Sequence, residues 1–82
     1  MPYLELAGVL NQLAGTTRLE AQGAANAYAG TSKLELVEAL NVKAGITVPT
    51  FLEFAGACNK IAGTTGLGGI HALNVKAGNT LP

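Results

Sequence analysis

The chain is built from five copies of one fifteen-residue unit. The copies span residues 4–18, 19–33, 34–48, 52–66 and 67–81, and a three-residue insertion occupies 49–51. A unit this short cannot bury an apolar face by itself, so each copy must pack against others in one continuous core. The repeat therefore predicts a single helical-repeat domain over residues 1–82. We number the positions within the unit from 1 to 15.

Three kinds of residue mark the unit in every copy: leucine at position 1, asparagine at position 8, and alanine-glycine at positions 11 and 12. Each asparagine lies near the predicted end of a helix, where its amide can satisfy backbone groups of the neighbouring turn. We expect all of these residues to be structural, so that replacing Asn41 with leucine lowers stability. The leucines are Leu4, Leu19, Leu34, Leu52 and Leu67, the asparagines are Asn11, Asn26, Asn41, Asn59 and Asn74, and the glycines are Gly15, Gly30, Gly45, Gly63 and Gly78.

Each unit reads as one short helix and one turn. A serine or threonine three residues before a glutamate marks a helix start, because each side chain accepts a backbone N–H that the helix leaves unpaired. This pattern predicts helix caps at Thr17, Ser32 and Thr50, with Thr65 as the equivalent residue before the fifth helix. The glycine of position 12 predicts the helix end. We expect an all-α array of five helices of about eleven residues, joined by tight Gly-Thr turns that reverse the chain sharply.

The repeat also predicts how the helices pack. Small residues at positions 5, 6 and 11 favour close helix contacts, and the insertion, with Pro49 before Thr50, is expected to divide the array into three units and two. Glycines at 66, 68 and 69 predict that the fifth helix is the weakest, or that it depends on contacts with another chain. Few polar residues close the two ends, although terminal repeats normally carry a polar outer face. We therefore expect open, apolar ends.

Composition excludes several classes of function. Charged residues make up 12% of the chain, apolar residues make up 49%, the mean hydropathy is +0.35 and the net charge is zero. A nucleic-acid partner is not expected, because phosphate binding requires clustered Lys and Arg. No apolar run reaches the roughly 18 residues of a membrane span, so we expect no membrane partner. A weakly charged chain with few bulky residues is expected to bury much of its surface against another protein.

The sequence offers no set of groups for catalysis. His71 is the only histidine and Cys58 the only cysteine, and neither has partners that would form a metal site or a triad. We expect His71 to be a surface or interface residue and Cys58 to be a buried thiol. Glu35 and Glu38 are read as a solvated helix face, and the glycine-rich stretch 63–69 lacks the ending of a phosphate loop. The prediction is a protein without catalytic residues, metal, cofactor or small-molecule substrate.

The repeat resembles short Ala/Gly-rich proteins, and segments of larger ones, encoded among the virion genes of tailed bacteriophages, particularly those of actinobacteria. The resemblance covers nearly the whole chain and is carried by the Leu-Glu helix starts, the asparagine of position 8 and the Ala-Gly-Thr-Thr turns at 14–17 and 62–65. It implies a structural protein of the virion, either a minor capsid or capsid-decorating protein or a tail-associated component. The implied partners are the major capsid protein, another virion protein, and further copies of the chain. Ile46, the Gly68-Gly69 pair and the insertion depart from the pattern.

Two other classes of function stay open. A membrane-active helical protein similar to the circular bacteriocins would also be short, apolar and multi-helical, but those chains are usually basic, whereas this one is neutral. An adaptor or small-ligand repeat module would bind through the variable positions 4, 5 and 9 of the unit.

Overall fold

The computed structural model describes residues 2–47 and 50–80, so Pro49 of the insertion lies outside the described residues. It contains five nine-residue helices: α1 (Leu6–Ala14), α2 (Ala21–Ala29), α3 (Leu36–Ala44), α4 (Phe54–Ala62) and α5 (Gly69–Ala77). Within those residues the only β-type pairing outside the helices is an isolated bridge between Pro2 and Thr80. The expectation of an all-α fold with one helix per repeat is confirmed.

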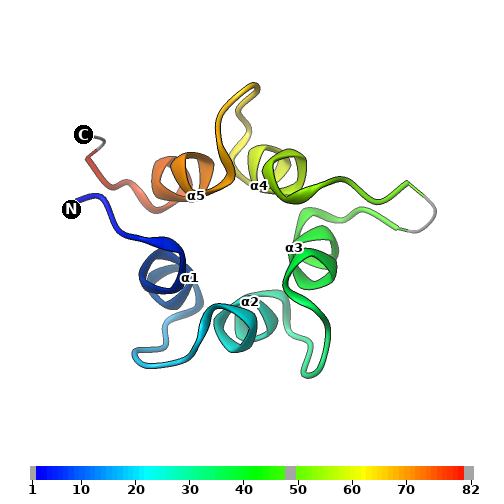
Figure 1. The fold of residues 1–82 in the computed structure, drawn as a ribbon, viewed down its shortest axis with the longest axis horizontal. Coiled ribbons are helices and arrows are strands. Elements are labelled where there is room, and N and C mark those ends of the chain that lie inside the picture. The colour runs from blue at the N-terminus through cyan, green and yellow to red at the C-terminus, as the bar shows by residue number, and fades with distance from the viewer. Residues whose placement is uncertain (1, 48–49, 81–82) are drawn as a thin grey trace.

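The five helices stand side by side in a closed ring, seen end-on in Figure 1. Each helix packs against the next, and α5 packs against α1. The molecule measures 35 × 28 × 13 Å, and its short dimension matches the length of about 13 Å that a nine-residue helix spans. The expectation of open ends is therefore wrong, because the first and last repeats cover each other.

All five helices run along the ring axis and point in the same direction. Asn11 donates from Nδ2 to the carbonyl of Ala7, one turn earlier in α1, and also to the carbonyl of Leu19. Leu19 therefore lies level with the middle of α1, two residues before α2 begins. The connection has led the chain back along the outside of the ring (Figure 1). The prediction that successive helices reverse sharply is therefore wrong, because the chain runs back through the connection before the next helix begins.

The helices begin later than the capping pattern predicts. Their N-cap residues are Glu5, Glu20, Glu35, Glu53 and Gly68, at position 2 of each unit. Thr17, Ser32, Thr50 and Thr65 cap no helix and lie exposed in the connections. The physical reason is that the leucine of position 1 is held by an asparagine of the preceding helix and stays outside its own helix. The one capping box in the described residues joins Glu35 and Glu38 in place of the expected Ser32 and Glu35: the Glu35 N–H donates to Glu38 Oε1 at 3.2 Å, and the Glu35 carboxylate accepts the N–H of Glu38.

The helix ends are as predicted. The glycine of position 12 has a φ between +76° and +79° in four units and +72° in the unit of Gly63, where an L side chain would be strained. The next residue donates its N–H to the carbonyl of the position-8 asparagine at 2.9–3.0 Å, as Thr16 does to Asn11. This bond satisfies a carbonyl that the helix end leaves unpaired.

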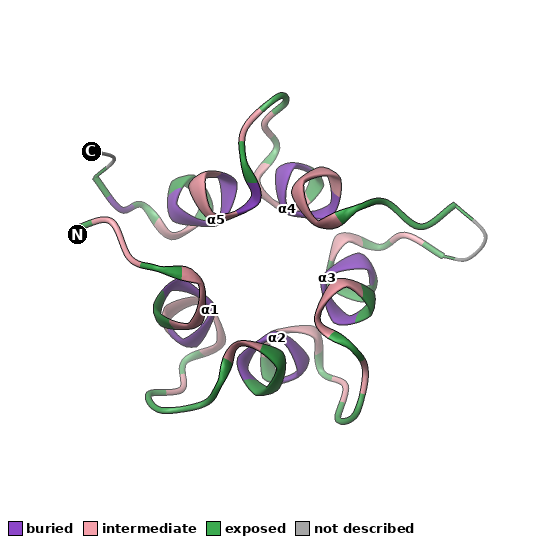
Figure 2. Ribbon diagram, in the orientation of Figure 1, coloured by how far each residue is buried: buried purple, intermediate pink, exposed green. Residues whose placement is uncertain are grey.

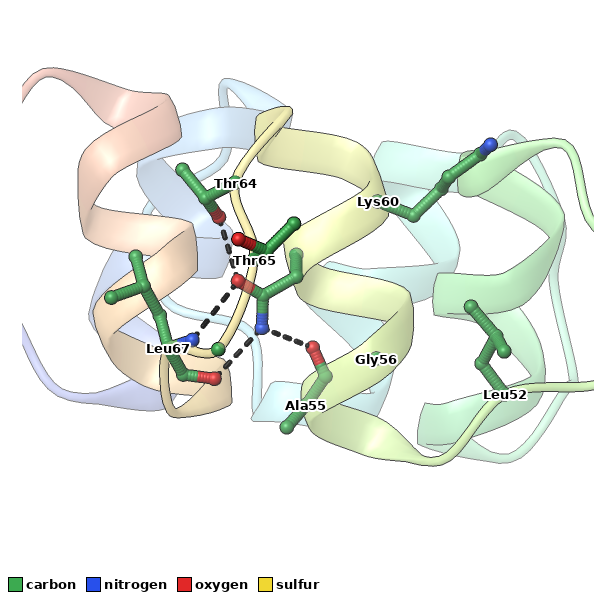
Figure 3. A pocket seen from close by; sticks show the side chains of 9 residues that line it. Leu52, Ala55, Gly56, Lys60, Thr64, Thr65 and Leu67 are labelled. Atoms are coloured by element: carbon green, nitrogen blue, oxygen red, sulfur yellow. Dashed lines mark hydrogen bonds between the residues drawn. The ribbon is translucent and has the colours of Figure 1, made fainter.

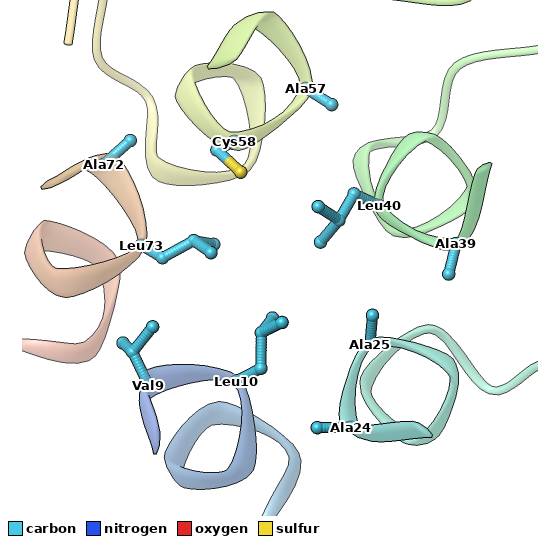
Figure 4. Packing of buried hydrophobic residues seen from close by; sticks show 10 residues of the cluster. All are labelled: Val9, Leu10, Ala24, Ala25, Ala39, Leu40, Ala57, Cys58, Ala72 and Leu73. Carbon is cyan, nitrogen blue, oxygen red and sulfur yellow. The ribbon is translucent and has the colours of Figure 1, made fainter. Parts of the chain in front are cut away.

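Among the described residues, the buried ones lie in the five helices, with Asn79 as the one exception (Figure 2). Position 7 points toward the ring axis, and position 6 points toward the preceding helix (Figure 4). All ten side chains are fully buried: Leu10, Ala25, Leu40, Cys58 and Leu73 at position 7, and Val9, Ala24, Ala39, Ala57 and Ala72 at position 6. Alanine at position 6 lets neighbouring helices approach closely, as expected. Position 5 has another role, because Gly8, Gly23 and Gly56 lie beneath the leucine of their own unit.

The insertion lengthens the connection between α3 and α4 without separating them. These two helices pack against each other, and Asn41 of α3 bonds to Leu52 across the insertion. The insertion therefore does not divide the array into three units and two. It only lengthens one outer connection of an unbroken ring.

Gly69 is buried for a packing reason. A Cβ atom placed on Gly69 would lie 2.2 Å from Cε2 of Phe54, which occupies the corresponding position 3 of the preceding unit. The Phe54 ring therefore fills the space that a side chain of α5 would otherwise take. The glycine at the start of α5 is complementary to the aromatic residue of α4.

We expect Gly69→Ala to lower the free energy of unfolding by about 1–3 kcal/mol, because the added methyl group overpacks the ring of Phe54. The control is Gly23→Ala in α2, where the new Cβ makes ordinary contact at 3.6 Å with Leu19. That change should stabilise the protein by about 0.5–1 kcal/mol through helix propensity. Urea unfolding followed by circular dichroism measures both, and Phe54→Leu should relieve the defect of Gly69→Ala. Equal effects of the two alanine substitutions would contradict this packing.

Candidate functional site

The most regular polar feature is a pair of hydrogen bonds that each position-8 asparagine makes to the next unit. Its Nδ2 donates to the carbonyl of the position-1 leucine, and its Oδ1 accepts the N–H of the same leucine, at 2.7–3.2 Å. We call this pair the Asn–Leu clamp. The clamps are Asn11–Leu19, Asn26–Leu34, Asn41–Leu52, Asn59–Leu67 and Asn74–Leu4. The last one joins the end of the chain to its beginning.

The clamps use the full hydrogen-bonding capacity of the amide in four units. The second Nδ2 hydrogen goes to the carbonyl of the residue four positions earlier in the helix, at 2.7–2.9 Å. Oδ1 also accepts from the hydroxyl of Thr16, Thr31 or Thr64, or from Nδ2 of Asn79. In the third unit the residue at the equivalent position 13 is Ile46, whose side chain has no hydrogen-bond donor. Two donors and two acceptor sites are what an asparagine side chain has.

The asparagines are also buried, with exposed fractions between 0 and 8%. A buried amide without partners would be strongly unfavourable, whereas these amides are satisfied by groups that would otherwise be unpaired themselves. These bonds to backbone groups of the neighbouring unit are the contacts that a structural role of position 8 predicts. The threonines of position 13 were missed as its partners, although their recurrence in three units is visible in the sequence.

The contact between α5 and α1, which we call the seam, has polar and aromatic contacts of its own. Nδ2 of Asn79 donates to Oε1 of Gln12 at 2.9 Å, linking the two ends of the chain. Tyr3 and His71 pack edge to face, with ring centroids 6.3 Å apart. His71 is thus a half-buried residue at an internal interface. Nothing in its sequence position pointed to Tyr3, because the two meet only when the ring closes.

Cys58 is buried and the Glu35 and Glu38 carboxylates are exposed, as the sequence predicts. Cys58 is fully buried at the ring axis, and burial raises the pKa of its thiol from about 9 to about 12. A thiol held neutral in this way is a poor nucleophile. Glu35 and Glu38 are exposed on the first turn of α3.

The outer side of α4 carries an open hollow of about 540 Å³ (Figure 3). Its lining includes Ala55, Gly56 and Lys60 at positions 4, 5 and 9, and the connection 64–67. The hydroxyl of Thr64 and the amide of Asn59 lie in its wall but are already bonded to each other. The hollow therefore presents mainly small and apolar groups, with the amine of Lys60 at its edge.

Comparisons of the chain with protein-family models, with curated proteins and with solved structures give no match. Across residues 2–47 and 50–80, no three His, Cys, Asp or Glu residues come together in a way that could hold a metal ion. The helices in that part of the chain are too short to cross a membrane. The site with the clearest geometry is the ring of Asn–Leu clamps.

Asn41→Leu should lower the free energy of unfolding by about 2–4 kcal/mol, because it leaves the N–H and the carbonyl of Leu52 without partners. Val42→Leu is the matched control, since Val42 is the adjacent residue and is 42% exposed. Chemical denaturation at constant pH measures both changes. A loss below about 0.5 kcal/mol for Asn41→Leu would show that the clamp contributes little.

The buried thiol predicts a loss of stability in alkali. Above about pH 9 the unfolded chain releases the Cys58 proton while the folded chain keeps it up to about pH 12. The unfolded state then binds fewer protons, so this thiol lowers stability by about 1.4 kcal/mol for each pH unit in that window. Cys58→Ala, which reproduces Ala25 at the same position, should remove this share of the slope in urea titrations between pH 8 and pH 11. An unchanged slope in the variant would contradict the burial of the thiol.

Proposed function

We propose that the protein is a non-enzymatic structural component of a bacteriophage particle, a minor capsid or capsid-decorating protein that binds the shell in many copies. The resemblance of its repeat to virion proteins supports this proposal, and so does the exterior of the ring. The expected partner is the major capsid protein or another virion protein.

The observation that carries the proposal is the repetition of the outer connections around a closed ring. Two of the position-1 leucines, Leu19 and Leu52, keep 42% and 37% of their surface exposed, whereas Leu4, Leu34 and Leu67 are half-buried against the core. Phe51 adds a third exposed apolar side chain beside Leu52, at 37%. A surface repeated around an axis suits a partner whose subunits are themselves repeated, as shell subunits are.

The distribution of polar groups supports the same proposal. The buried asparagines are bonded within the ring, so an external partner would meet the exposed leucines and the connections between helices. A net charge of zero also removes repulsion between copies bound close together on one particle.

A tail-associated location is the second candidate, since the resemblance covers tail components as well. A membrane-active function of the bacteriocin type remains the alternative from another class. Dye release from vesicles of anionic lipid tests that alternative directly, and strong release at low protein concentration would favour it over the virion proposal.

The protein should co-purify with particles of the phage that encodes it. Particles banded in a density gradient are analysed by quantitative mass spectrometry, and the protein is expected at a fixed ratio to the major capsid protein. Separating heads from tails then assigns the location. Recovery only in the soluble fraction at the top of the gradient would overturn the proposal.

A further inference from the structure

The two flat sides of the ring carry opposite charges. We call the side where the helices begin the N-terminal face and the side where they end the C-terminal face. All acidic residues of the chain lie in the N-cap or first turn of a helix, and thus on the N-terminal face: Glu5, Glu20, Glu35, Glu38 and Glu53. Lys43, Lys60 and Lys76 lie in the last turns of α3, α4 and α5, on the C-terminal face.

These charges cannot satisfy each other within one ring. The helices are parallel, so the two faces are separated by the 13 Å thickness of the molecule. The two remaining cations, Arg18 and Lys33, lie exposed in the outer connections, outside the helices. The helix ends on each face have the sign opposite to its charged side chains and offset part of their charge, so the attraction between faces rests on the side chains that extend beyond the helix ends.

Each face also carries half-buried apolar side chains. Position 3 supplies Leu6, Leu36 and Phe54 to the N-terminal face. On the C-terminal face, position 10 is the half-buried Leu13, Tyr28 or Ile61 in three units and Lys43 or Lys76 in the other two, and the amine of Lys43 lies 4.4 Å above the ring of Tyr28. Apolar contact and charges of complementary sign would thus act together where two such faces meet.

We propose that copies of this protein stack head to tail, with the N-terminal face of one ring on the C-terminal face of the next. An ellipse of 35 × 28 Å covers about 770 Å², close to the roughly 800 Å² that each partner buries in a standard interface. Because the helices are spaced around a ring, a rotation about its axis can set the lysines of α3, α4 and α5 over N-cap glutamates of three other helices. The two faces differ, so the contact is heterologous and extends into a column.

Sedimentation velocity of the purified chain over a concentration series tests this stacking. Species larger than a dimer should form at low salt. The apparent dissociation constant should rise about tenfold or more between about 0.05 M and 0.5 M NaCl, because the Debye length shortens as the salt concentration rises. A monomer at every concentration, or a dimer that does not extend, would overturn the proposal.

Charge reversal identifies the faces. Lys43→Glu/Lys76→Glu should abolish self-association, whereas Arg18→Glu/Lys33→Glu, with the same change in net charge on the outer connections, should retain it. Circular dichroism confirms that each variant is folded. If the charge-reversed variant does not fold, Lys43→Gln/Lys76→Gln removes the two positive charges without reversing them and should weaken self-association. Equal behaviour of the face variant and the control would overturn the assignment.

A mixing experiment then separates stacking from general electrostatic attraction. Glu5→Lys/Glu20→Lys/Glu53→Lys should also stay monomeric alone, because both of its faces are then basic. Mixed with Lys43→Glu/Lys76→Glu, it should associate, since each variant supplies the charge that the other lacks. Failure of the mixture to associate, with both variants folded, would overturn the proposal.

Discussion

The Asn–Leu clamp is the interaction on which the rest of the structure depends. It pairs a side-chain amide with both backbone groups of one residue, much as a neighbouring strand would, and so fixes the following unit in position and direction. Because the clamped leucine lies outside the helix and the N-cap residue after it is extended, the next helix starts two residues later, at the level where the previous helix started. Parallel helices, late helix starts and outer connections all follow from this single contact.

The clamp also explains why small residues suffice for the core. Nine-residue helices are too short to be stable alone, and alanine contacts bury little apolar area per residue. In this ring the backbone pairing between units is made by buried, fully satisfied amides, which set the spacing at which the alanines of position 6 come into contact. The high alanine and glycine content of the sequence thus follows from a close helix spacing imposed by hydrogen bonds.

The sequence predicts the local structure well and the global arrangement poorly. The glycines of position 12 identify every helix end, because a positive φ has a strong residue preference that acts locally. The Ser/Thr-x-x-Glu pattern misplaces the helix starts, because Asn11 and its equivalents bind the leucine that the pattern assigns to the helix. Closure could not be derived from the repeat alone. A linear array and a ring share the same unit and differ only in the contacts of the ends, here Asn74 with Leu4 and Gln12 with Asn79.

The number of units in the ring is matched to the side chains at its axis. Around the ring, position 7 reads Leu10, Ala25, Leu40, Cys58 and Leu73, so large and small residues alternate except at the seam, where Leu73 and Leu10 are neighbours (Figure 4). At that same contact position 6 is Val9 in place of alanine, so the seam carries the bulkiest pair of side chains at position 7 and the bulkiest side chain at position 6. All of these side chains are fully buried, so the differences between the copies are part of how the closed ring fills its interior.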